Sequence, residues 1–253
     1  MSCLLYCIFS RQAPLHPTPV LGVGGQPVFL VTQGSLRAAV SGTSPTLVSN
    51  LSGLKAYGRV VACIHQHHTV IPVRYGCVLP DESQVAWLLE NHRREYEALL
   101  TELSGCVEMG LRVKVDPEQS EPGEMQEPER PPVTPSSPEL SGAAYLLARR
   151  AHYAALDQET QVVQNLAATC LAHFTGLFIK SKIEGPLPQL PLLSLYFLVP
   201  ANRVESFRQA FLGLRLPPEA NMLLSGPWPP YNFVGHGSAP GSVQSTLHPA
   251  VGG

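Results

Sequence analysis

The sequence predicts an α+β fold with two domains, an N-terminal mixed α/β domain over residues 1–103 and a C-terminal domain over residues 104–234. Short apolar runs typical of strands alternate with longer segments whose apolar residues recur at helical spacing. A chain of 253 residues is long enough to bury two cores of ordinary size. In the second half, the elements follow the order βαββαβ, which predicts a self-contained second domain.

A strand and a hairpin open the N-terminal domain. Residues 3–9 are almost entirely apolar, which predicts a strand. Residues 27–31 and 35–41 then predict a hairpin that turns at Gly34, because glycine readily takes the positive φ that a tight turn requires.

A helix over residues 50–66, a strand over 69–79 and a second helix complete this domain. Pro72 has no backbone donor, so we expect its strand at a sheet edge or at a bulge. Asp81 can cap the second helix while Gln84 reaches back to it in a capping box. The apolar positions of this helix keep a spacing of three and four and predict one buried face: Val85, Leu88, Leu89, His92, Tyr96, Leu99 and Leu103.

The C-terminal domain is expected to hold four strands and two helices. They are strand 105–115, helix 140–174, strand 176–183, strand 191–199, helix 202–213 and strand 220–225. Asn202 and Glu205 form a second capping box. The buried stripe of the last helix comprises Val204, Phe207, Phe211 and Leu214. This order of elements is that of the ferredoxin-like fold.

Two segments are predicted to stay outside the packed domains. Residues 116–139 contain seven prolines and seven acidic residues, which favours a solvated, extended loop. This loop is interpreted as an insertion without function or as an acidic docking segment. The tail over residues 235–253 is predicted to be disordered.

Composition argues against several classes of protein. The formal net charge is −2, and the chain has no run of Lys and Arg, so nucleic acid is not expected as a partner. Residues 12–36 are uncharged but interrupted by Pro and Gly, so they predict no membrane span. The first nine residues lack the positive charge of a secretory signal, and we therefore expect a cytoplasmic protein with reduced cysteines.

The motifs of common enzyme classes are missing from the sequence. It contains no Gly-x-Ser-x-Gly, no phosphate loop and no His-Glu-x-x-His. The glycines at 22–27 lack the following helix of a dinucleotide site. Cys63, His65 and His68 could ligate zinc together with Cys77, but a second pair of ligands is missing, and a polar helix end is the favoured interpretation. We predict no catalytic residue, no cofactor and no metal.

The segment 225–234, SGPWPPYNFV, is the most unusual part of the chain. Its prolines stiffen the backbone toward polyproline II, and Trp228, Tyr231 and Phe233 supply a large apolar area. Three interpretations remain open: a clasp that buries Trp228 in its own domain, an exposed docking site for another subunit, or a Pro-x-x-Pro ligand of an SH3-type domain.

This segment resembles the terminal motif of the gas vesicle protein GvpF/GvpL family. Other segments are similar to that family in the same order, between about residues 3 and 234. They are CLLYCIF, TVIPVRYGCVL, CVEMGLRVKV, SGAAYLLARR and SLYFLVPANRVESF. No single segment decides the assignment, but their joint occurrence is highly specific.

The resemblance implies a minor structural or assembly component of gas vesicles that has no enzymatic activity and is found on the gas vesicle in the cytoplasm. The implied partners are the hydrophobic major shell protein (GvpA type), which this protein would keep from aggregating, and other gas vesicle accessory proteins. It also implies a two-domain α+β fold with a ferredoxin-like part.

We expect the partner interface to include eight residues: Trp228, Tyr231, Phe233, Pro227, Pro229, Pro230, Arg74 and Tyr75. The alternative is a small-molecule-binding sensor or enzyme on a ferredoxin-like scaffold, which requires a concave pocket with converging polar groups. A third possibility is a generic scaffold that binds its partner through the acidic loop.

Overall fold

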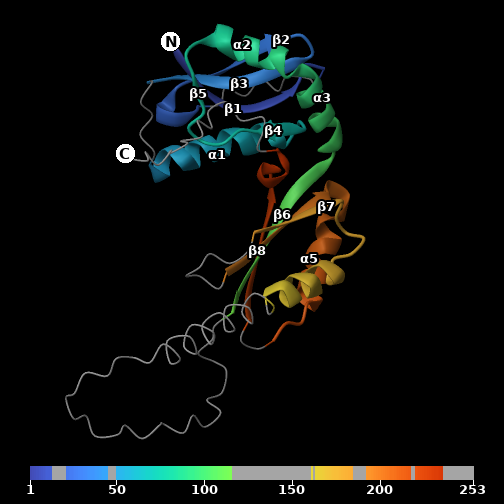
Figure 1. Cartoon of the computed structure of the whole chain (residues 1–253). Helices are drawn as coiled ribbons and strands as arrows, with labels where there is room; N and C mark the ends of the chain where they lie inside the picture. Colours follow the sequence, from blue (N-terminus) through green and yellow to red (C-terminus); the bar gives the residue numbers. More distant parts are fainter. Residues whose placement is uncertain are drawn as a thin grey trace, which may run out of the picture. The chain divides into compact units, whose positions relative to one another are not determined.

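The structure is a computed structural model that describes residues 1–12, 21–44, 50–115, 161, 163–184, 192–217 and 220–235 (Figure 1). The chain divides into two compact units. The first contains Met1–Met109, Leu198–Asn202 and Gly226–Gly253, and the second contains Gly110–Phe197 and Arg203–Ser225. A compact unit is not necessarily a domain that folds on its own. The domain boundary predicted between residues 103 and 104 therefore stays a prediction.

The first unit is built on a five-stranded antiparallel sheet. Its strands are β1 (Ser2–Ser10), β2 (Val28–Gln33), β3 (Leu36–Thr43), β4 (Val70–Pro72) and β5 (Val78–Leu79). They follow the order β2-β3-β1-β4, and β5 also pairs with β1. The predicted strand at 3–9 and the hairpin are confirmed, and Gly34 takes a φ of 57° at the turn.

Strand β1 is buried on both faces, which explains its continuous apolar sequence. Cys3 and Leu5 face one hydrophobic cluster, and Leu4 and Tyr6 face the other. A shift of register between Leu5 and Cys7 then places Tyr6 and Cys7 on the same face. This is the behaviour of a β-bulge, which adds one residue to one strand of a pair.

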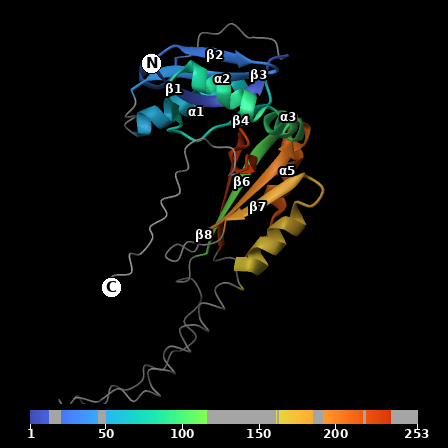
Figure 2. The ribbon, with the colours of Figure 1, turned by 45° about the horizontal axis from the view of Figure 1, so that its top comes forward.

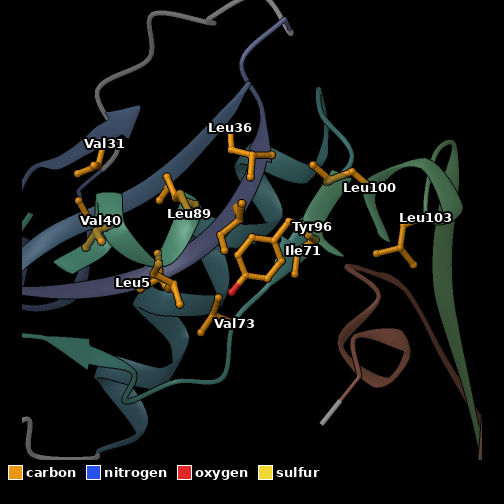
Figure 3. Close-up of a cluster of buried hydrophobic side chains, with 14 of the residues drawn as sticks. Leu5, Val31, Leu36, Val40, Ile71, Val73, Leu89, Tyr96, Leu100 and Leu103 are labelled. Carbon is orange, nitrogen blue, oxygen red and sulfur yellow. The ribbon is translucent and has the colours of Figure 1, made fainter. Parts of the chain in front are cut away.

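Helices cover the two faces of this sheet (Figures 1 and 2). Helix α1 (Leu51–His65) contributes Tyr57, Val60 and Val61 to one cluster. Helices α2 (Glu82–Asn91) and α3 (Arg93–Glu102) cover the opposite face. Figure 3 shows this second cluster, in which the ring of Tyr96 lies among Leu5, Ile71 and Val73.

Two predictions for this unit were wrong in detail. The single helix after Asp81 is two helices that meet at His92, although the Asp81 carboxylate does accept a hydrogen bond from the Gln84 backbone at 2.9 Å. The strand over 69–79 is divided by a turn in which the Cys77 N–H donates to the Arg74 carbonyl at 3.3 Å. Gly76 has a φ of 97° there, a conformation that a regular strand does not contain.

The second unit is built on the four-stranded sheet β7-β8-β6-β9. Its strands are β6 (Cys106–Val115), β7 (Lys180–Glu184), β8 (Leu192–Pro200) and β9 (Ala220–Trp228), and three of them continue into the first unit. Residues 163–173 are helical, and α5 (Val204–Gly213) follows a 3-10 turn, η3 (Ala201–Arg203). The stacked rings of Phe174 and Phe207 lie 4.2 Å apart, and both contact Phe197 of β8.

The ends of three elements differ from the sequence predictions. The capping box of Asn202 and Glu205 does not form, because α5 begins after Arg203 and has no side-chain cap. The strand predicted at 176–183 starts only at Lys180, and β9 continues to Trp228 instead of ending at 225. Of the predicted stripe of α5, Phe207 and Leu214 are buried, whereas Val204 and Phe211 are half-buried.

Several predictions fall on residues that the structure does not describe. They are the acidic loop over 116–139, most of the helix over 140–174 and the tail after residue 235. Within the described ranges, every helix is too short or too polar to cross a membrane. The first unit contains the residues that the sequence predicts for the partner interface.

Candidate docking surface

The aromatic segment at 226–234 belongs to the first unit. Near the end of β9, the chain passes through a cis peptide bond between Gly226 and Pro227, and after Trp228 it enters a 3-10 turn, η4 (Tyr231–Phe233). The Tyr231 N–H donates to the Pro229 carbonyl at 2.8 Å, and the Phe233 N–H donates to the Pro230 carbonyl at 3.2 Å. The segment therefore ends in a hydrogen-bonded turn rather than in the predicted extended polyproline conformation.

Most of this segment packs against its own unit. Pro229 and Pro230 are buried, Tyr231 packs against the cluster around α1, and Phe233 packs against the cluster around α2 and α3. Trp228 behaves differently, since 51% of its surface is exposed. The interpretation in which Trp228 is the buried clasp was wrong, because the prolines, Tyr231 and Phe233 anchor the segment instead.

A buried carboxylate on β6 holds the turn. Glu108 is only 4% exposed, and it accepts two hydrogen bonds from Asn232, one from the backbone N–H and one from the side-chain Nδ2, each at 2.8 Å. Glu108 is not among the site residues that the sequence predicts. The signal it left is a lone acidic residue within the otherwise apolar start of β6.

A group of tyrosines brings together two of the predicted interface residues. The Tyr57 ring lies 4.9 Å from the Tyr6 ring and 5.2 Å from the Tyr75 ring, and Tyr231 packs against the same cluster. The Tyr57 hydroxyl donates to the Val73 carbonyl at 2.7 Å. Tyr75 and Tyr231 therefore share one support, although they are more than 150 residues apart.

The environment keeps the phenols of Tyr57 and Tyr231 neutral. Burial, followed by the nearby Tyr231, raises the pKa of Tyr57 well above its ordinary value. Burial also raises the pKa of Tyr231, with smaller effects from Cys7 and Glu108. Tyr57 and Tyr231 consequently present apolar rings and neutral hydroxyls, which suits packing rather than acid–base chemistry.

Of the remaining predicted interface residues, Arg74 and Pro227 are exposed. Arg74 stands at the start of the turn that Gly76 permits, and Pro227 precedes Trp228. Tyr75 is half-buried, and its ring lies against the start of α1, where a Cβ on Gly53 would lie 2.5 Å from the Tyr75 hydroxyl. Arg74 and Trp228 are thus the exposed ends of two segments that share the tyrosine cluster as their support.

The zinc candidates do not assemble in the part of the chain that the structure describes. No group of three or more His, Cys, Asp or Glu side chains is arranged there to hold a metal ion. Burial lowers the pKa of His65, and the ring of His68 stacks on Phe9 at 5.2 Å. His65 and His68 are therefore packed at the end of α1, whereas the sequence favours a polar helix end.

The first unit also has an open pocket of about 510 Å³ between the end of α1 and helix α3. Its polar side chains include Glu97, two histidines and several hydroxyls. The Ser35 hydroxyl donates to the Glu97 carboxylate, so one acidic group is already engaged. The eight predicted interface residues do not line this pocket.

Residues 2–235 match a family model described as gas vesicle synthesis protein GvpL/GvpF. The chain belongs to the GvpL/GvpF family. This membership confirms the resemblance seen in the sequence and supports a role connected with gas vesicles.

The GvpL/GvpF chain is similar to curated relatives along its length. It is 27% identical over 240 residues to gas vesicle protein L of Streptomyces sp. (strain CB03234), covering 87% of each chain. It is also 27% identical over 250 residues to gas vesicle protein F of the same strain, covering 92% of this chain and 100% of the relative.

Two crystal structures share the fold. GvpF from Anabaena sp. PCC7120 has a TM-score of 0.71 at 17% identity, covering 92% of this chain and 96% of the other. GvpF from Microcystis aeruginosa has a TM-score of 0.70 at 14% identity, covering 92% of this chain and 99% of the other. The mixed α+β fold with two antiparallel sheets is therefore that of these GvpF structures.

Proposed function

We propose that this GvpL/GvpF chain is a non-catalytic component that supports gas vesicle formation by binding the hydrophobic major shell protein (GvpA type). The observation that carries the proposal is the half-exposed indole of Trp228, on a segment whose neighbouring residues are buried in the first unit. The docking surface comprises Arg74, Tyr75, Pro227, Trp228, Tyr231 and Phe233, together with the buried Pro229 and Pro230 that hold its backbone.

Binding through such a surface follows from its apolar and rigid character. Aromatic side chains contribute large contact areas, and a segment already ordered in the free protein loses little entropy on binding. Only 14% of the chain is charged, so few charged groups have to be desolvated when an apolar partner docks. The bound surface would cover apolar area of the shell protein and keep it from aggregating before assembly.

The same proposal implies where the protein is found and which other proteins it meets. A protein that binds the shell subunit would be found on gas vesicles in the cytoplasm, together with other gas vesicle accessory proteins. Neither nucleic acid nor a membrane is part of this proposal.

The finer architecture is also a proposal. We assign the sheet β7-β8-β6-β9 and its helices to a ferredoxin-like domain. When the four strands are numbered by their order along the chain, their order across the sheet is 2-3-1-4. Helical residues 163–173 lie between β6 and β7 in the chain, and α5 lies between β8 and β9, as the order βαββαβ requires. This arrangement supports the domain predicted over residues 104–234.

The chain offers a matched control for a binding test, because it has two exposed tryptophans. Trp87 is 58% exposed on α2, and Trp228 is 51% exposed on the docking surface. In co-purification with the major shell protein, we expect Trp228→Ala to reduce the recovered partner strongly and Trp87→Ala to leave it unchanged. Equal recovery with both variants would remove Trp228 from the interface.

The pocket beside α3 keeps the alternative function testable. A small-molecule sensor or enzyme needs converging polar groups, and Glu97, His67 and Thr101 line this pocket. Mass spectrometry of the purified protein under native conditions would detect a retained metabolite. A bound ligand lost on Glu97→Gln, with shell-protein binding unaffected by Trp228→Ala, would favour the alternative.

A further inference from the structure

We infer that Glu108 is the positioning residue of the docking surface: it anchors both ends of the loop that carries Trp228. This inference rests on the proposed function, and it adds a residue that does not itself contact the partner. It is carried by the geometry of residues 226–232, which comprise the last three residues of β9 and the turn after it and are called the loop below. Each end of this loop meets a different part of Glu108.

The first end of the loop lies against the Glu108 backbone. A Cβ on Gly226 would lie 2.7 Å from the Glu108 carbonyl oxygen and 3.3 Å from the Met109 Cα. The φ of Gly226 is 114°, which side chains rarely allow. The chain therefore enters the loop in direct contact with β6, and only glycine fits at this point.

The second end of the loop is held by the Glu108 side chain. Its two carboxylate oxygens accept from the backbone N–H and the Nδ2 of Asn232, each at 2.8 Å. Hydrogen bonds to a carboxylate are among the stronger ones in proteins, and removing a partner from a buried carboxylate is costly. Asn232 is thus fixed in both its backbone and its side chain.

Trp228 lies between these two anchors. Pro229 and Pro230 follow it and are buried, so the loop has little freedom once Gly226 and Asn232 are held. An indole on such a loop is ordered before the partner arrives, and this ordering reduces the entropy lost on binding. Glu108 therefore acts on affinity through the position of Trp228.

The test exchanges donors and acceptors between Glu108 and Asn232. Glu108→Gln places an amide nitrogen against the donors of Asn232, whereas Asn232→Asp places two carboxylates together. In the double variant both bonds can return: the new amide oxygen accepts from the backbone N–H, and the new amide nitrogen donates to the new carboxylate. Each single variant should disturb the loop, and the exchange should restore it.

The readout is the fluorescence of Trp228 in the full chain. Trp87→Phe leaves Trp228 as the single tryptophan, because the sequence contains only two. For each single variant we expect stronger quenching by acrylamide and lower anisotropy of Trp228, both returning to the parent values in the double variant. Unchanged Trp228 signals in both single variants, or no recovery in the double variant, would overturn the inference.

Binding to the shell protein separates the two proposals. We expect roughly a tenfold loss of affinity in each single variant, the equivalent of one charged hydrogen bond, with recovery in the exchange. If Trp228→Ala leaves binding unchanged, the proposed function fails, and the fluorescence still decides the role of Glu108. Should a single variant not fold, Asn232→Ala removes only the side-chain donor, and its Trp228 quenching should still exceed that of the parent.

Discussion

Helix α2 and the aromatic segment each expose one tryptophan but hold it in different ways. Trp87 lies on a regular helix whose opposite face contributes Val85, Leu88 and Leu89 to a hydrophobic cluster. Trp228 is the last residue of strand β9, and the irregular turn that follows it is held by buried prolines and by one buried carboxylate. Exposure alone therefore does not mark a docking residue. The difference is that the loop around Trp228 is anchored by specific contacts that regular secondary structure does not require.

The largest expected effect concerns the hydrophobic support of α2. Leu89 is fully buried, so Leu89→Ala should lower the free energy of unfolding by about 2–5 kcal/mol through lost burial and a cavity. Urea titration followed by circular dichroism measures the change. A loss below about 1 kcal/mol would show that α2 is not held by its buried face.

Backbone strain at the start of the loop gives the next effect. Gly226→Ala would place a Cβ on a residue with a φ of 114°, 2.7 Å from the Glu108 carbonyl oxygen. We expect it to lower the free energy of unfolding by roughly 1–3 kcal/mol or more. Gly58 in α1 is the matched control, because a Cβ there meets nothing within 4 Å. Gly58→Ala should stabilise the protein slightly, since alanine favours helices more than glycine does. Thermal unfolding of both variants checks the contrast.

Alkaline pH should weaken the support of the docking surface. Burial raises the pKa of Cys77 from 9.0 to about 11, so the folded state keeps this proton where the unfolded state loses it. The stability contributed by Cys77 is therefore complete below pH 9 and falls as the pH rises toward 11, by at most about 1.4 kcal/mol per pH unit. Urea titrations at pH 8, 9 and 10 test the slope. Cys77→Ala should make the slope shallower without removing it, because burial also raises the pKa of Cys7 and Cys170. An unchanged slope would contradict this assignment.

The smallest expected effect on stability comes from the two tryptophans themselves. Trp87→Ala and Trp228→Ala should each change the free energy of unfolding by less than about 1 kcal/mol, because both side chains are half exposed or more. A similar stability for the two variants makes any difference in partner binding a property of the docking surface. A large loss in Trp228→Ala alone would show that this indole also holds the fold.

Local patterns in the sequence predicted the elements whose causes are local. The apolar run of β1, the turn at Gly34 and the cap at Asp81 all depend on neighbouring residues, and each is present. The break at His92 could not be seen, because His92 continues the three-and-four spacing of the buried face. The turn at Gly76 was overlooked because the residues around it have the composition of a strand.

The candidate site was predictable only in part, for a related reason. Trp228, Tyr231 and Phe233 stood out by composition and by resemblance, but which ring is exposed depends on the tertiary packing of each one. The bonds between Glu108 and Asn232 join residues 124 positions apart. No local periodicity connects such a pair. A lone acid in an apolar strand is the only trace it leaves in the sequence.

The bulge in β1 restricts which pieces of related chains can be exchanged. Tyr6 and Cys7 point to the same side, so the strand counts one residue more than its neighbour β3 at this point. Leu5 pairs with Val40 and Cys7 pairs with Ala39, so the side chains after the bulge keep the faces of regular alternation, and Tyr6 is the extra residue. A chimera whose first strand lacks this residue would therefore keep Phe9 in its layer but lose the Tyr6 ring, which stacks on Tyr57 at 4.9 Å.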